Sequence, residues 1–170
     1  MKEIVNKVKK QDKLVTIDLE TFGSKKAIID FDIKEFLFKG LILKEKEFRK
    51  QLSEYAWERL DGKCLAVHCS TDAIVAKWAY MLVTAKAKKF AQDVFYGSPE
   101  EVTNKLFKRN LNAHDWTAYQ DKFVLLKGCS TSPISEEIYL HATKKLLPYV
   151  KKLMYGEACS SVPVYSKPRN

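Results

Sequence analysis

The chain has 170 residues, 46% of them hydrophobic, and its length and composition exclude a fibrous or largely disordered protein. It carries 30 Lys and Arg against 21 Asp and Glu, a net charge of +9 that comes mostly from dispersed lysines. Lysines without clustered arginines favour a solvated surface over a nucleic-acid partner. No run approaches the ~18 apolar residues of a membrane span, and no apolar signal segment follows the lysine-rich start. We therefore expect a cytoplasmic protein without a membrane partner.

The first third of the chain predicts an extension made of a hairpin and helices. Residues 14–19 and 27–31 are short apolar runs on either side of Phe22-Gly23-Ser24, a turn-forming sequence, and we expect them to pair as a β-hairpin. Residues 33–38 predict a short helix, and residues 44–55 a longer one whose apolar side chains face inward.

Two later segments share one pattern of residues. Trp57 and Trp116 each precede a short apolar run, and each run leads into a Cys-Ser-Thr triplet, at Cys69 and at Cys129. An amphipathic stretch follows in both copies, and both close on a Tyr-Gly pair. So many shared features in one order indicate an internal duplication, with repeat units at about 57–97 and 116–156.

Each copy predicts a strand, a helix and a second strand. The runs 64–67 and 123–126 do not alternate, as is typical of strands buried on both faces. Helices are expected over 73–90 and 134–147, with short strands over 94–96 and 152–155. A right-handed crossover makes such strand pairs parallel. With a further helix over 99–110 and an irregular tail, we predict a single α/β domain over 1–170, built on a mostly parallel sheet.

Three of the four cysteines share one sequence context. Cys69, Cys129 and Cys159 each begin a Cys-Ser-Thr or Cys-Ser-Ser triplet, whereas Cys64 lies inside a predicted strand and is expected in the core. Thiols in a reducing cytoplasm do not form a disulfide framework. The carboxyl ends of parallel strands share one sheet edge, so we expect the three triplet cysteines to converge there.

Three interpretations of these cysteines stay open. The first is a metal site for zinc or iron. The second is a reactive-thiol site in which one thiolate attacks and a neighbouring cysteine resolves. The third is a non-enzymatic binding or assembly module, in which the cysteines are small packed side chains at helix N-caps. The sequence does not decide whether the protein is an enzyme.

Further residues belong to these interpretations. The candidates for a fourth metal ligand are His68, Asp72 and Glu157. Hydroxyl groups that follow the cysteines are expected to cap the two helices, whose unpaired N–H groups can also bind an anion. These predicted caps are Ser70, Thr71, Ser130 and Thr131.

Several segments carry a resemblance to a known family. They are residues 30–34 (DFDIK), 40–49 (GLILKEKEFR), 127–130 (KGCS) and 155–165 (YGEACSSVPVY). Over about residues 3–167 the chain resembles DUF2480, a bacterial family of unknown function. The resemblance implies a cytoplasmic single-domain protein of about this size and assigns no activity or catalytic residue. A homo-oligomer and an unidentified small-molecule ligand are both compatible with it.

Overall fold

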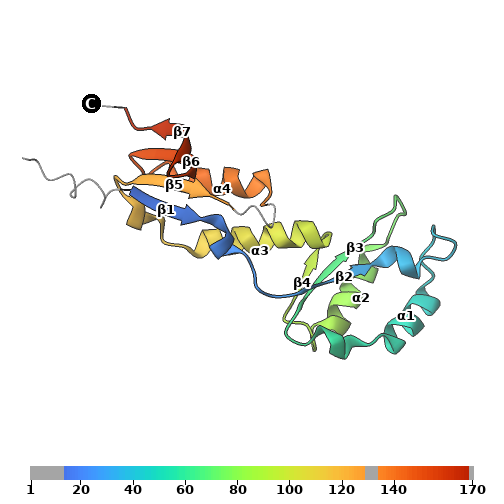
Figure 1. Cartoon of the computed structure of the whole chain (residues 1–170). Helices are drawn as coiled ribbons and strands as arrows, with labels where there is room; N and C mark the ends of the chain where they lie inside the picture. Colours follow the sequence, from blue (N-terminus) through green and yellow to red (C-terminus); the bar gives the residue numbers. More distant parts are fainter. Residues whose placement is uncertain (1–13, 129–133, 169–170) are drawn as a thin grey trace, which may run out of the picture. The chain divides into compact units, whose positions relative to one another are not determined.

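The computed structural model describes residues 14–128 and 134–168, which form a mixed α/β structure (Figure 1). The chain divides into two compact units: unit 1 comprises Met1–Gly23 and Leu106–Asn170, and unit 2 comprises Ser24–Lys105. From residue 14 onward the chain therefore passes from unit 1 into unit 2 and then returns to unit 1. Each predicted repeat lies within one unit, and the assignment of both to a single domain stays a prediction.

Unit 2 contains a three-stranded parallel sheet. Its strand order is β2-β3-β4, and Cys64 at the start of the central strand pairs with Ile28 on one side and Asp93 on the other. Its elements are β2 (Ile28–Asp32), η3 (Ile33–Phe36), α1 (Glu45–Glu54), η4 (Trp57–Leu60), β3 (Cys64–His68), α2 (Lys77–Ala87) and β4 (Asp93–Tyr96).

Unit 1 contains a four-stranded sheet in the order β1-β5-β6-β7. The first three strands are parallel, and β7 is antiparallel to β6. The helix α3 (Pro99–Ala113) begins in unit 2 and ends in unit 1. The other elements are β1 (Leu14–Asp18), η2 (Leu19–Phe22), η5 (Trp116–Tyr119), β5 (Phe123–Lys127), α4 (Glu136–Leu146), β6 (Lys152–Glu157) and β7 (Ser160–Ser166).

The two central strands, β3 and β5, are buried along most of their length, as their unbroken apolar runs predicted. Cys64 is 1% exposed and packs in the core, which confirms its predicted place. Each unit has its own hydrophobic cluster, around Phe48 and Leu65 in unit 2 and around Leu126 and Ile138 in unit 1. None of the helices within the described residues is long and apolar enough to cross a bilayer.

The predicted N-terminal hairpin is wrong, because β1 and β2 belong to different sheets. β1 lies parallel to β5, and β2 lies parallel to β3. Two apolar runs around a turn fit a hairpin pattern, but here Ile17 and Phe31 are buried in two separate cores. The pattern of a short strand shows that it is buried on one face and does not identify its partner.

The tail is also more regular than predicted. A turn at Ala158 and Cys159 leads into β7, which pairs along β6. Most residues of β7 are exposed, so no alternation of apolar side chains marks this strand in the sequence. Pro163 is compatible with its position because β7 is an edge strand.

Both helices begin later in the chain than the predicted caps require. α2 begins at Lys77 with Ala76 as its N-cap, so Ser70 and Thr71 lie in the preceding loop. Their polar groups bond within that loop and to β2 instead: the Ser70 N–H donates to Asp32, and Thr71 contacts Cys69. α4 begins at Glu136 with Ser135 as its N-cap. Ser130 and Thr131 lie outside the described residues.

Equivalent elements of the two units keep one constant offset in residue number from η4 and η5 onward, as the pairs Trp57/Trp116, Cys64/Phe123 and Tyr96/Tyr155 illustrate. The indole N–H of Trp57 donates to the Leu52 carbonyl and that of Trp116 to the Leu111 carbonyl, both at 2.8 Å. With this offset Cys69 aligns with Gly128 rather than with Cys129, so the two Cys-Ser-Thr triplets are out of step.

The buried indole hydrogen bonds predict matched losses of stability. Trp57→Phe and Trp116→Phe should each lower the free energy of unfolding by about 1–3 kcal/mol, because each leaves a buried carbonyl without its donor. Trp78→Phe, at a half-buried indole, is the control and should cost less. Urea unfolding followed by circular dichroism measures the stability of all three variants. A loss for Trp78→Phe as large as the losses for Trp57→Phe and Trp116→Phe would contradict a specific role of the two buried indole hydrogen bonds.

Candidate functional site

Two regions gather functional side chains: the carboxyl edge of the sheet in unit 2, and a pocket in unit 1. In open parallel sheets, ligands bind beyond the carboxyl ends of the strands, where the strand order reverses. The parallel strands follow chain order in both sheets, as β2-β3-β4 and as β1-β5-β6. Neither sheet therefore has a reversal point among the described strands, and any site must be built by individual side chains.

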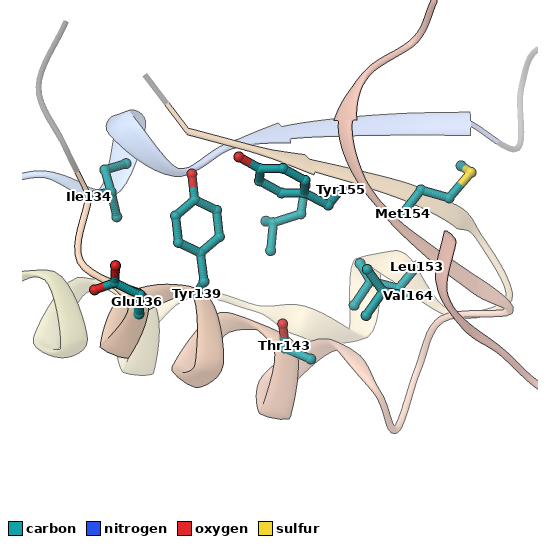
Figure 2. A pocket seen from close by; sticks show the side chains of 9 residues that line it. Ile134, Glu136, Tyr139, Thr143, Leu153, Met154, Tyr155 and Val164 are labelled. Carbon is teal, nitrogen blue, oxygen red and sulfur yellow. The ribbon is translucent and has the colours of Figure 1, made fainter. Parts of the chain in front are cut away.

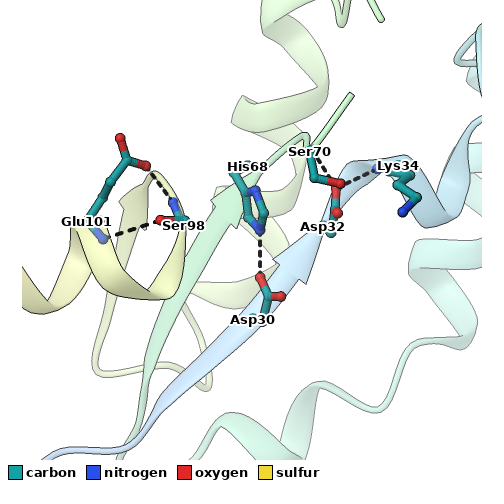
Figure 3. Close-up of polar contacts among 7 residues, drawn as sticks. All are labelled: Asp30, Asp32, Lys34, His68, Ser70, Ser98 and Glu101. Carbon is teal, nitrogen blue, oxygen red and sulfur yellow. Dashed lines mark hydrogen bonds and ion pairs between the residues drawn. The ribbon is translucent and has the colours of Figure 1, made fainter. Parts of the chain in front are cut away.

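At the edge of unit 2, a histidine is held by a neighbouring strand. His68 ends β3, and its Nε2 lies 2.8 Å from Oδ1 of Asp30 on β2 (Figure 3). The imidazole is 17% exposed, whereas the Asp30 side chain is half exposed to solvent. In unit 1 the equivalent position is Lys127, whose Nζ lies 3.5 Å from carboxylate oxygens of Asp18 and Glu157. Both central strands thus end in a basic side chain that interacts with carboxylates.

Asp32 connects the end of β2 to the loop that follows β3. Its Oδ1 accepts hydrogen bonds from the backbone N–H of Lys34 and of Ser70, at 2.9 and 3.1 Å (Figure 3). Partial burial acts to raise the pKa of Asp32, but the hydrogen bonds from Ser70 and Lys34 outweigh it. The pKa of Asp32 is therefore held below its ordinary value, and the carboxylate is a structural acceptor.

The N-terminus of α3 is closed by its own residues. The Ser98 N–H donates to the Glu101 carboxylate, and the Glu101 N–H donates to the Ser98 hydroxyl (Figure 3). These reciprocal bonds form a capping box. The hydrogen bond from the Ser98 backbone is the main cause of the lowered pKa of Glu101. This helix end is consequently satisfied internally.

The structure does not bring the three triplet cysteines together among the described residues. Cys69 follows β3 in unit 2, is half-buried, and has its Sγ 3.3 Å from Thr71 Oγ1. Cys159 is exposed in the β6–β7 turn of unit 1, and Cys129 lies outside the described residues. Within residues 14–128 and 134–168, no three His, Cys, Asp or Glu side chains form a group that could hold a metal ion.

The proposed fourth ligands are divided in the same way. His68 and Asp72 belong to unit 2 with Cys69, whereas Glu157 belongs to unit 1 with Cys159. His68 is bonded to Asp30, Glu157 interacts with Lys127, and Asp72 is exposed in the loop before α2.

Unit 1 contains a pocket of about 550 Å³ between α4 and the strands β5, β6 and β7 (Figure 2). Figure 2 shows Glu136, Tyr139 and Thr143 projecting from one side of α4 toward the strands. Their spacing of three and four residues places them on one helix face. The other lining residues are Leu126, Ile134, Leu153, Met154, Tyr155 and Val164.

Two tyrosines form the polar centre of this pocket. The rings of Tyr139 and Tyr155 meet edge to face, with centroids 5.7 Å apart. Burial is the main cause that raises the pKa of Tyr139 above its ordinary value, and the charge and hydrogen bond of the neighbouring Tyr155 raise it further. Gly128 is required beside them, because a Cβ atom on that residue would overlap the Tyr139 hydroxyl. Tyr139 therefore remains a neutral phenol at neutral pH.

Sequence reasoning missed this pocket because it depends on β7, which supplies Val164 and has no clear sequence pattern. The signal that was present is the repeated tyrosine. Tyr80 and Tyr96 of unit 2 occupy the positions equivalent to Tyr139 and Tyr155, and their rings also meet edge to face, 5.6 Å apart.

The role of Asp32 predicts a pH-dependent loss of stability. Asp32→Asn should lower the free energy of unfolding by about 1 kcal/mol at pH 7, because hydrogen bonds to a charged acceptor are weakened. The pKa of Asp32 is lower in the native state than in the unfolded state, where it is ~4, so the charged carboxylate stabilises the fold at any pH above the unfolded-state pKa. This stabilisation is lost as the pH falls through the native-state pKa. The difference from wild type should therefore shrink below about pH 4.

Thermal unfolding between pH 7 and pH 3 measures this difference. Asp72→Asn, at an exposed carboxylate of the same loop region, is the matched control and should change stability by less than about 0.5 kcal/mol. A deficit of Asp32→Asn that stays constant down to pH 3 would contradict the role of the charged carboxylate.

Comparison with known proteins gives a family without an assigned activity. No curated protein and no solved structure matches the chain. The family model described as "Protein of unknown function (DUF2480)" matches residues 2–167, which is nearly the whole length. The protein therefore belongs to the DUF2480 family.

Proposed function

We propose that the protein is a non-enzymatic binding module whose unit 1 pocket takes a small, mostly apolar molecule. The observation that supports this is the pocket itself, whose volume of about 550 Å³ falls within the usual range for small-molecule sites. Its walls combine aliphatic side chains with a few polar groups, as is typical of such sites.

The polar groups of the pocket suit binding better than proton transfer. A general base must lose its proton near the working pH, whereas burial raises the pKa of Tyr139 further above neutrality. The Tyr139 phenol is hydrogen-bonded to Tyr155, so this pair has one hydroxyl proton left to donate to a ligand. The Thr143 hydroxyl can donate or accept a hydrogen bond. The aliphatic walls, including Leu126 and Leu153, then supply the apolar contact.

Binding of the neutral fluorescent probe 1-N-phenylnaphthylamine tests this function. Wild-type protein should increase the probe's fluorescence in a saturable manner, and Thr143→Phe should weaken binding by about tenfold or more because the larger ring fills the pocket. Thr84→Phe, at the equivalent position of α2 in unit 2, is the matched control and should bind as wild type. Equal binding by the two variants would contradict the assignment to unit 1.

A second candidate function is a metal or reactive-thiol site made by Cys69, Cys129 and Cys159. It is favoured by the position of Cys69, which lies directly beyond the carboxyl end of the central strand β3. The Cys69 thiol is near Thr71, and it also contributes to the raised pKa of Tyr80, whose main cause is burial. In this hypothesis, which comes from the sequence, zinc or iron is held by the three thiolates with His68, Asp72 or Glu157 as a fourth ligand, and the described residues by themselves form no such group.

Metal content and thiol reactivity test this second candidate. Protein purified without a histidine tag should contain about one equivalent of zinc or iron if the metal version holds, and Cys129→Ser should lose it. Less than about a tenth of an equivalent in both proteins would contradict the metal version. For the thiol version, three thiols should react rapidly at neutral pH, and thiols that react only after unfolding would contradict it.

We also infer that the two repeat units descend from one duplicated segment. The constant offset in residue number, the matched indole hydrogen bonds and the matched tyrosine pairs support this inference. The left-handed backbone at Gly62 and at Asp121, which are equivalent under the same offset, adds a further common feature.

A further inference from the structure

We propose that the unit 1 pocket selects ligands that carry a positive charge, and that Glu136 is the residue that determines this specificity. The inference rests on the proposed binding function and adds the chemical class of the ligand. That class is a small molecule with an apolar body and an ammonium group.

The first observation is that the Glu136 carboxylate lines the pocket without a partner among the residues that the structure describes. Within this part of the chain it makes no ion pair or hydrogen bond. The adjacent Glu137, in contrast, pairs with Lys108 of α3. The nearby carboxylates of Asp18 and Glu157 both interact with Lys127. A cationic ligand would supply the partner that Glu136 lacks.

The second observation is the chemistry of the remaining wall. Tyr139 and Tyr155 present aromatic rings to the pocket (Figure 2). Aromatic faces attract ammonium groups through their quadrupole. Leu153 and Val164 lie at the other end of the pocket from Glu136, whose own end also contains Ile134 (Figure 2). This polarity matches a ligand with a charged end and an apolar end.

The third observation comes from comparison of the two units. Tyr139, Thr143 and Tyr155 have Tyr80, Thr84 and Tyr96 at the equivalent positions of unit 2, so these polar side chains are the same in both units. The position equivalent to Glu136 is Lys77, which has the opposite charge. The two surfaces therefore carry opposite charges at this position, and only unit 1 adds the wall of β7 and the small residue Gly128.

Two opposing fields limit the size of the effect. Glu136 is the first residue of α4, where the helix dipole favours a negative group, and the whole chain carries a net charge of +9. Glu136 is also exposed, so solvent screens its attraction for a cation. Together with the aromatic rings, a preference for a cation of about three- to tenfold is expected.

Displacement of bound 1-N-phenylnaphthylamine by n-octylammonium, n-octanol and n-octanoate tests the charge preference. The three competitors share one alkyl chain and differ in charge. Octylammonium should displace the probe from wild-type protein at a concentration about three- to tenfold lower than octanoate, and octanol should require a concentration between the two. Glu136→Gln should abolish this difference, and Glu136→Lys should reverse it. Glu137→Gln is the control and should keep the wild-type order.

The outcomes separate this inference from the proposed function. If the probe binds wild type and Thr143→Phe equally, or does not bind, the pocket function itself fails. If the probe binds in the pocket but the three competitors displace it equally, or Glu136→Gln keeps the wild-type order, the charge preference is overturned while the pocket function stands. Circular dichroism of Glu136→Gln verifies that α4 is intact.

Discussion

The parallel pairing of β1 with β5 is the contact on which the arrangement of the chain depends. Leu14 pairs with Phe123, so the first strand of unit 1 finds its partner only after all of unit 2 has been made. The pairing places Ile17 in the same core as Leu126 and Ile138. Such a contact closes a very long loop, and the cost of closure grows only slowly with loop length. The burial of the central strand β5 between β1 and β6 can therefore offset the cost of closing this loop.

The candidate sites follow from differences added to this shared plan. In unit 2, Asp30 and Asp32 on the edge strand hold His68 and the loop that contains Ser70. These contacts leave the polar groups at this edge occupied with one another. In unit 1, β7 adds an outer wall beside β6, and Gly128 leaves room for the Tyr139 hydroxyl. The pocket lies where unit 1 has an additional strand, β7, and a smaller residue, Gly128.

The net charge of the whole chain and the charge of Glu136 at the pocket act over different distances. The excess of lysine gives the chain its net charge of +9, and many of these lysines are paired or dispersed. Glu136, in contrast, is one local charge at the pocket, and in the proposed function it acts only at short range. Since interactions between exposed charges are screened beyond about 10 Å, the proposed ligand preference depends on the local geometry of the pocket and not on the net charge of the chain.

The sequence by itself determined the α/β class, the two buried central strands, the parallel strand pairs β3–β4 and β5–β6, and most helices, because continuous apolar runs and helical periodicity are local signals. Tertiary structure alone decided the partners of β1 and β2, the strand β7 and the pocket that β7 completes. These features depend on contacts between distant residues, and an exposed edge strand such as β7 carries no burial pattern. The cysteine triplets showed the same limit: their likeness is local, whereas Cys69 and Cys159 belong to different units.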